Sequence, residues 1–245
     1  MIPEYTMRTQ VTTFDVGPER RLKYSMLLRY LQEAADRQMR EDGMSYETLR
    51  DMGVVFVLTR ADVSVKRLPS PGEDIAVNTW FKGFHGAEFI RNMTVEDTRG
   101  GTLAEAETRW VTVDPEKHRI VRPAAFPFPE KIKSTAGNKV ETPHITFKTA
   151  EVPLEAWRTF SREIRWSDVD FNGHVNNAVY ADFLCDYFPS GIHGRELDYF
   201  GINFSGEARE GDELKIRSAQ YEGNAVLCGT ISGRRCFEAA ARCRG

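Results

Sequence analysis

The sequence repeats one pattern twice, an amphipathic helix followed by alternating strands, and this repeat restricts the folds open to the chain. Apolar residues recur at the i, i+3, i+4, i+7 spacing of a helix face from Leu27 to Ala34. The same spacing returns from Tyr180 to Tyr187, 153 positions later. We expect Asn177 to cap the second helix and Pro189 to follow its end.

After each helix pattern the apolar period changes from 3.6 to two, as in half-buried strands. The first alternating run opens with Gly72–Ile75, and the second opens with the similar phrase Gly211–Leu214, 139 positions later. The offset therefore falls from 153 to 139, which predicts a 14-residue insertion in the first copy, around Gly43–Gly53. Trp110 lies in a further long strand candidate, from Leu103 to Val113.

The repeat indicates two similar units joined by a proline-rich polar run. We predict a first unit over residues 1–125, an extended linker over 126–153 and a second unit over 154–245. A helix followed by several antiparallel strands is typical of the α+β class. Each unit is expected to wrap a curved antiparallel sheet round a long helix, with the two units side by side.

Composition excludes several classes of function. The 245 residues carry a formal net charge of −3, and no basic arm or nucleic-acid-binding motif is present. The first ten residues lack the apolar core of a signal peptide, and the longest apolar run, Val54–Leu58, is too short to cross a membrane. We therefore expect a cytoplasmic protein that binds neither nucleic acid nor membrane.

The four cysteines give no sign of a metal or redox site. They lie at Cys185, Cys228, Cys236 and Cys243, and none of them forms a C-x-x-C pair. Buried, reduced thiols are the expected state, Cys185 included, and no metal ligand is predicted.

The segment 168–177, which reads DVDFNGHVNN, carries the strongest chemical signal. In an extended chain Asp170, Asn172 and His174 would share one face and bring a carboxylate, an amide and an imidazole together. An ordinary polar turn is the alternative, since Asp, Asn and Gly are also common turn residues. Asp168 is either a rival base on the same face or a turn-capping residue.

The repeat assigns this constellation to one unit only. Counting back 153 positions, Asp170, Asn172 and His174 fall opposite Gly17, Glu19 and Arg21. The first unit thus has the scaffold without the polar triad.

The run Trp166–Tyr180, W-S-D-x-D-x-N-x-H-V-N-N-x-x-Y, resembles the acyl-acyl-carrier-protein thioesterases, a family of tandem hotdog folds. YLQEAA at Tyr30–Ala35, the P-x-P-G turn at Pro69–Gly72 and TRWVTVD at Thr108–Asp114 extend the resemblance over nearly the whole chain. It implies a thioester hydrolase that releases free fatty acid from acyl carrier protein in fatty acid biosynthesis, without a cofactor. It also implies that the first hotdog binds the acyl chain and the second performs the chemistry.

The resemblance carries over to four residues of this sequence. Asp170, Asn172 and His174 match the catalytic motif, and Glu207 matches a further acid of the family. The position of the family's cysteine is Ala208 here, so a thiol nucleophile is excluded at that position.

Two chemical routes and several alternatives stay open. Water activated by Glu207 or Asp170 is favoured over direct attack by a carboxylate, which would form an anhydride. An acyl-coenzyme A thioesterase of the same fold and a catalytically silent acyl-binding hotdog protein are the rival functions. Arginines at 158, 162 and 165, and others near the C-terminus, form either a docking rim for an acidic carrier protein or a solvated face. Both a monomer and a homodimer fit the sequence.

Overall fold

A computed structural model describes residues 4–132, 134, 140, 142–147 and 149–244. Within these residues the α-helices are α1 (Tyr24–Glu41), α2 (Tyr46–Asp51) and α3 (Val179–Asp186). The strands of the first half are β1 (Tyr5–Gln10), β2 (Val55–Val65), β3 (Asp74–His85), β4 (Glu88–Asp97), β5 (Thr102–Asp114) and β6 (Arg119–Val121). Those of the second half are β7 (Arg158–Glu163), β8 (Leu197–Phe204), β9 (Glu213–Tyr221), β10 (Asn224–Ile231) and β11 (Arg234–Cys243).

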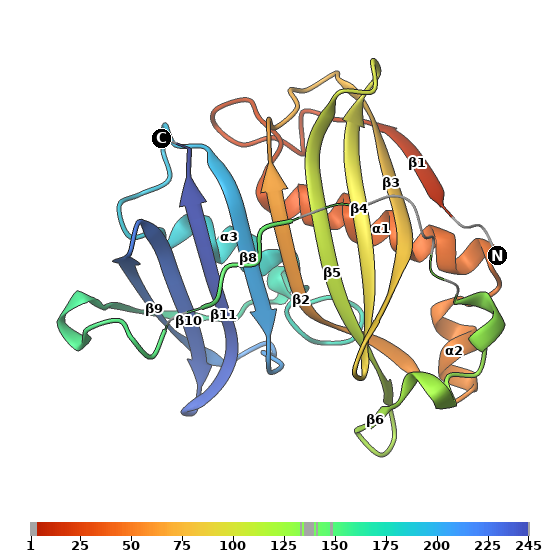
Figure 1. Cartoon of the computed structure of the whole chain (residues 1–245). Coiled ribbons are helices and arrows are strands. Elements are labelled where there is room, and N and C mark those ends of the chain that lie inside the picture. The colour runs from red at the N-terminus through yellow and green to blue at the C-terminus, as the bar shows by residue number, and fades with distance from the viewer. Residues whose placement is uncertain (1–3, 133, 135–139, 141, 148, 245) are drawn as a thin grey trace.

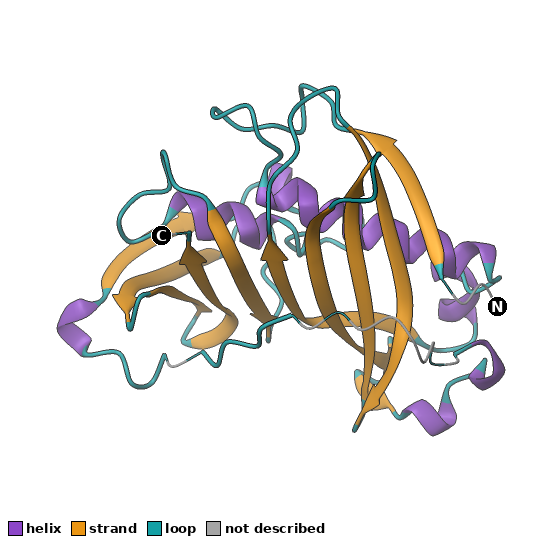
Figure 2. Ribbon diagram, turned by 45° about the horizontal axis from the view of Figure 1, so that its top comes forward, coloured by secondary structure: helices purple, strands orange, loops and turns teal. Residues whose placement is uncertain are grey.

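The described strands form one curved antiparallel sheet (Figure 1). Their order is β1-β3-β4-β5-β2-β8-β11-β10-β9-β7, and β6 pairs with β5. The two halves meet where Arg60–Ser64 of β2 pairs with Tyr199–Asn203 of β8. Figure 2 shows α1 and α3 along the same side of this sheet. The arrangement confirms the predicted α+β class, with two helix-and-sheet units side by side.

The apolar stripes of both helices face the core, as their spacing predicts. Leu27, Leu31 and Ala34 of α1 are buried, and so are Phe183 and Leu184 of α3. None of the helices in the described part of the chain is long and apolar enough to cross a membrane.

The predicted cap of the second helix is wrong by one residue. Ala178 occupies the N-cap position, and α3 begins at Val179. The side chain of Asn176 accepts a hydrogen bond from the Ala178 amide at 3.0 Å and so closes a local turn ahead of the helix. Asn177, the predicted cap, lies inside that turn.

The two glycine phrases form the same turn in both units. The Gly72 amide donates to the Val11 carbonyl at 2.8 Å, and the Gly211 amide donates to the Ile164 carbonyl at 2.9 Å. Both glycines have positive φ angles, +87° and +84°, which a side chain would disfavour. The repeat in the sequence is therefore a structural repeat.

The insertion predicted in the first unit is also present. Helix α1 has 18 residues and α3 has 8, and α2 follows α1 within Gly43–Gly53. The extra length of α1 and all of α2 thus belong to the first unit alone.

Buried polar side chains brace the seam between the two halves. Asp62 of β2 accepts bonds from the Arg60 Nε at 2.6 Å and from the Tyr199 hydroxyl at 2.5 Å. Arg60 also reaches the linker, donating to the Ile145 carbonyl at 2.9 Å, and His144 Nδ1 lies 3.1 Å from Asp62. The part of the predicted linker around His144 and Ile145 is thereby fastened to the seam, whereas its first residues, Phe126–Ile132, pack against the first unit.

Replacing Asp62 with alanine should lower the free energy of unfolding by about 3–5 kcal/mol, because it leaves Arg60 buried without its carboxylate. Chemical denaturation measures this as a lower midpoint. The control is Glu105→Ala, which removes the exposed Lys66–Glu105 pair and should cost about 1 kcal/mol or less. Equal losses in the two variants would contradict the bracing role of Asp62.

Candidate active site

The polar segment of the second unit is a closed turn. The Asp170 amide donates to the His174 carbonyl at 2.9 Å, and the Gly173 amide donates to the Asp170 carbonyl at 2.9 Å. Gly173 has a φ of +75°, and Val169 bridges to Val175 across the turn. The extended conformation predicted from the alternation is therefore wrong, because the segment folds as a turn. The turn still gathers all three polar side chains within five residues.

Backbone pairing places Glu207 beside this turn. The Val175 amide donates to the Ala208 carbonyl at 2.8 Å, next to Glu207 in the chain. His174 Nε2 then lies 3.0 Å from the Glu207 Oε2, which also accepts from Arg209 at 3.0 Å. The imidazole and the fourth predicted residue are thus in direct contact, and both are partly exposed to solvent.

Asp170 and Asn172 form the other half of the cluster. The Asp170 Oδ1 accepts a hydrogen bond from the Asn172 amide at 2.8 Å. Among the described residues its second oxygen has no hydrogen-bond partner. Asp170 therefore presents one free carboxylate oxygen at the surface of the turn, joined to His174 through the backbone.

The first unit has the same turn without these side chains. The Gly17 amide donates to the Arg21 carbonyl at 2.9 Å, the counterpart of the Asp170–His174 bond. The Leu22 amide donates to the Pro69 carbonyl at 2.9 Å, the counterpart of the Val175–Ala208 bond. In this alignment Leu68, which is buried, occupies the place of Glu207. All four predicted residues thus lack a counterpart of like chemistry in the first unit.

Asp168 caps the turn and is not a free base. Its carboxylate is buried, accepts from the Arg165 amide at 3.0 Å and pairs with Arg162 at 2.7 Å. Asp15 makes the same bond in the first unit, accepting from the Thr12 amide at 2.7 Å. A residue with the same role in both copies serves the turn itself, so the capping alternative for Asp168 is correct.

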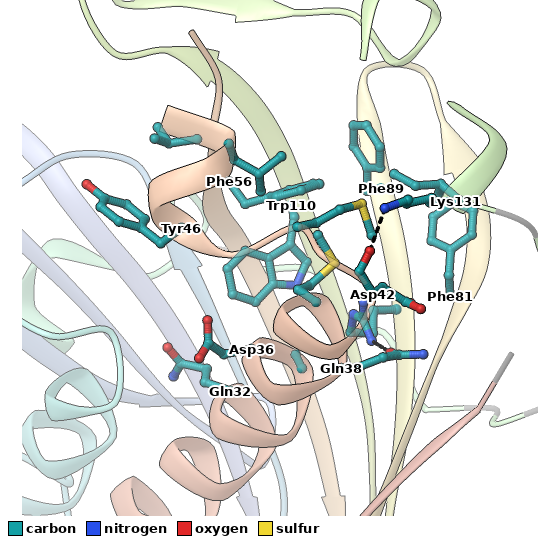
Figure 3. A pocket seen from close by; sticks show the side chains of 17 residues that line it. Gln32, Asp36, Gln38, Asp42, Tyr46, Phe56, Phe81, Phe89, Trp110 and Lys131 are labelled. Carbon is teal, nitrogen blue, oxygen red and sulfur yellow. Dashed lines mark hydrogen bonds between the residues drawn. The ribbon is translucent and has the colours of Figure 1, made fainter. Parts of the chain in front are cut away.

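A cavity of about 180 Å³ opens in the first unit, between the helix side of the sheet and the inserted segment (Figure 3). Its walls are the second half of α1, α2, strands β2 to β5 and, from the predicted linker, Lys131 and Ile132. Aromatic rings dominate the sheet side: Phe56, Phe81, Phe89 and Trp110. Several of the remaining lining residues, among them Met44 and Leu49, belong to the insertion or follow directly from it. The extra residues of the first unit therefore form one wall of a largely apolar cavity.

A guanidinium group lies inside this cavity. Arg91 of β4 donates from Nη1 to the Gln38 side chain and to the Thr79 hydroxyl, the latter at 3.0 Å. Burial lowers the pKa of Arg91 to about 10, against the opposing effect of Asp42, and the group stays charged at neutral pH. The alternation of β4 already puts Arg91 on the inward face with Phe89 and Met93, so this charge is readable in the sequence.

Tyr46 joins the cavity to the polar turn. It lines the cavity from the start of α2, and its hydroxyl donates to the Asn172 Oδ1 at 3.1 Å. Its ring also meets the Phe171 ring edge-on, with centroids 5.4 Å apart. Sequence reasoning misses this contact because 126 positions separate the two residues and no periodic pattern links them.

The other sequence candidates have structural roles. Burial raises the pKa of Cys185 to about 12, so this thiol is neutral at physiological pH.

Most of the arginines considered for a docking rim form bonds within the protein. Arg162 and Arg165 pair with acids, Arg158 donates to the Pro189 carbonyl, and Arg235, Arg242 and Arg244 also pair with acids. The alternative of a docking rim stays a prediction at these positions.

Family comparison accounts for both units. Residues 3–124 match the model of the acyl-ACP thioesterase N-terminal domain, and residues 154–232 match that of the C-terminal domain. The chain belongs to the acyl-ACP thioesterase family. The matches confirm the resemblance of the sequence, and they include the polar turn of the second unit and all but two of the residues that line the cavity, Lys131 and Ile132.

Relatives of this acyl-ACP thioesterase family member share about a fifth to a quarter of its sequence. A palmitoyl-acyl carrier protein thioesterase of Arabidopsis thaliana is 24% identical over 76% of this chain and 47% of its own length. A dodecanoyl-[acyl-carrier-protein] hydrolase of Cinnamomum camphora is 24% identical over 80% of this chain and 54% of its own length. The chain spans about half the length of these curated relatives.

Solved structures share the whole fold. An acyl-ACP thioesterase from Bacteroides thetaiotaomicron superposes with a TM-score of 0.85 at 21% identity, covering 99% of this chain and 98% of that one. A 12:0-ACP thioesterase from Umbellularia californica gives 0.79 at 18% identity, covering 98% and 97%. At these identities the likeness establishes the tandem hotdog fold.

Alanine at Asp15 or Asp168 should lower the free energy of unfolding by about 1–3 kcal/mol, because each leaves a turn amide without its acceptor. Alanine at Asp170 should cost less than about 1 kcal/mol, since its bond is exposed. Thermal unfolding compares the three variants. A loss at Asp170 as large as that at Asp168 would make Asp170 a structural group.

Proposed function

We propose that the protein hydrolyses the thioester of fatty acyl-acyl carrier protein and releases the free fatty acid, as in fatty acid biosynthesis. The observation that carries this proposal is the contact between Tyr46 and Asn172, which puts an apolar cavity against a carboxylate–amide–imidazole turn. An apolar tail and a polar, hydrolysable head need such neighbouring environments. Membership of the acyl-ACP thioesterase family supports the same substrate class.

The two units divide the work in this proposal. The first unit, residues 1–125, holds the acyl chain in its cavity. The second unit, residues 154–245, carries Asp170, Asn172, His174 and Glu207, and residues 126–153 link the two. The absence of the tetrad from the first unit's turn and the restriction of the insertion to the first unit both support this division.

Hydrolysis needs a base, a group for the carbonyl oxygen and a proton for the leaving sulfur. The free oxygen of Asp170 takes a proton from water as the water oxygen attacks the thioester carbon. The tetrahedral intermediate collapses, the carbon–sulfur bond breaks, and a proton ends on the thiolate of the phosphopantetheine arm. We assign the base to Asp170 because two side chains, those of His174 and Arg209, already engage the Glu207 carboxylate, whereas Asp170 accepts a bond from the Asn172 backbone amide.

The remaining groups orient and polarise the substrate. Asn172 donates from its amide to the carbonyl oxygen, where negative charge develops. Glu207 fixes the ring of His174, which stands next to the departing sulfur and relays the proton. No cofactor takes part, acyl carrier protein is the partner, and the compartment in this proposal is the cytoplasm, although the named plant relatives are chloroplastic.

Alanine at Asp170 should lower kcat on acyl-acyl carrier protein by about a hundred- to ten-thousandfold, the range of a lost general base. Release of free thiol from carrier protein measures the rate. The matched control is Glu19→Gln on the equivalent turn of the first unit, which should keep the activity of the unmodified enzyme.

Three results would count against parts of this proposal. Full activity in Asp170→Ala would overturn the assignment of the base. Faster turnover of the same acyl chain on coenzyme A than on carrier protein would favour the acyl-coenzyme A alternative. Oxygen from labelled water found in the Asp170 carboxylate after turnover would favour attack by the carboxylate itself.

Leucine at Ala35 should reduce kcat/KM for long acyl chains by about tenfold relative to medium chains, because the added carbons project into the cavity from α1. A panel of acyl-carrier-protein substrates of increasing length measures the change. Ala125→Leu, at an exposed position of the first unit, is the control and should leave the preference unaltered. Equal losses for all lengths at Ala35 would place the acyl chain elsewhere.

A further inference from the structure

Tyr46 contacts both the cavity of the first unit and the polar turn of the second. It is the first residue of α2, and the preceding residue, Ser45, caps that helix by accepting from the Thr48 amide at 3.2 Å. The cap fixes the start of α2 and hence the direction of the tyrosine side chain. Figure 3 shows the Tyr46 ring at one end of the cavity with its hydroxyl directed away from the other lining residues.

The hydroxyl controls which side of the Asn172 amide is available. A tyrosine O–H that donates to Oδ1 fixes the amide plane and leaves the two N–H donors of Nδ2 directed away from Tyr46. Edge-on packing of Tyr46 on Phe171, the neighbour of Asn172, restrains the same segment from a second direction. Asn172 is otherwise exposed, and an unrestrained amide would rotate freely.

We propose that Tyr46 is a positioning residue of the hydrolytic reaction, acting across the two units by holding Asn172 with its N–H groups toward the thioester oxygen. The inference rests on the proposed function. The ring of Tyr46 serves as a wall of the acyl cavity and its hydroxyl serves the chemistry, so the two roles separate on substitution.

The first unit provides a contact of the same kind without this role. His193 Nδ1 of the second unit lies 3.4 Å from the Oε1 of Glu19, the residue that occupies the place of Asn172. A contact between units therefore recurs at the equivalent turn position. A purely structural function for such contacts predicts that Tyr46 and His193 behave alike, whereas a positioning function predicts that they differ.

The test compares Tyr46→Phe with His193→Ala in the full-length enzyme. Tyr46→Phe should lower kcat on acyl-acyl carrier protein about tenfold, the equivalent of one hydrogen bond in the transition state, with KM unchanged because the ring remains. His193→Ala should keep kcat, and both variants should keep the melting temperature, since each contact is exposed to solvent.

Combining Tyr46→Phe with Asn172→Ala isolates the coupling between the two residues. If Tyr46 acts through Asn172, the double variant should be no slower than Asn172→Ala alone. A further tenfold loss in the double variant, or wild-type kcat in Tyr46→Phe, would overturn the positioning role. A rise in KM alone would assign Tyr46 to the cavity wall only.

The side-chain amide of Asn172 gives a readout that does not depend on turnover. In ¹⁵N-labelled protein its two N–H resonances should shift in Tyr46→Phe relative to the unmodified chain, with no such effect in His193→Ala. Unchanged resonances would overturn the inference. Absence of hydrolysis by the unmodified enzyme would instead overturn the proposed function, so the two failures are distinguishable.

Discussion

The pairing of β2 with β8 is the constraint on which the rest of the molecule depends. It joins two curved sheets into one and so brings the cavity of the first unit against the turn of the second. Polar groups buried at this seam make the pairing specific, because Asp62 is satisfied only when both Arg60 and Tyr199 are in place. Gly201 leaves room for them: a Cβ there would lie 2.8 Å from the Asp62 carboxylate.

The two copies of the unit have diverged in complementary ways on one scaffold. The hydrogen bonds that close the turn are the same in both, as the capping bonds of Asp15 and Asp168 show. What differs is the outward-facing side chains in the second copy and the added helical segment in the first. Because α2 and the second half of α1 supply walls of the cavity, this cavity lies in the unit that does not carry the polar tetrad.

Periodicity predicts the elements of this fold well, because burial of one face determines the spacing of apolar residues along a helix or strand. Periodicity fails at Asp170–His174. The polar residues alternate there as in a strand, but Asp, Asn and Gly are also turn residues, and Gly173 with its positive φ angle closes the turn. The choice of Glu207 follows from family resemblance and not from spacing, and its contact with His174 is seen only in the structure. Neither periodicity nor family resemblance points to Tyr46, because only the pairing of the sheets in three dimensions brings α2 to the polar turn.

The groups that stabilise the polar turn differ from those proposed for the reaction, and the equivalent turns of the two units can be compared to show this. A partly exposed contact such as His174–Glu207 contributes little to folding, whereas the buried carboxylate of Asp168, paired with Arg162, contributes more. The first unit closes the same turn with Gly17, in place of Asp170, so the fold does not require the carboxylate there. The fold requires the turn but not the Asp170 carboxylate. The side chain at this position can therefore be determined by the reaction and not by folding.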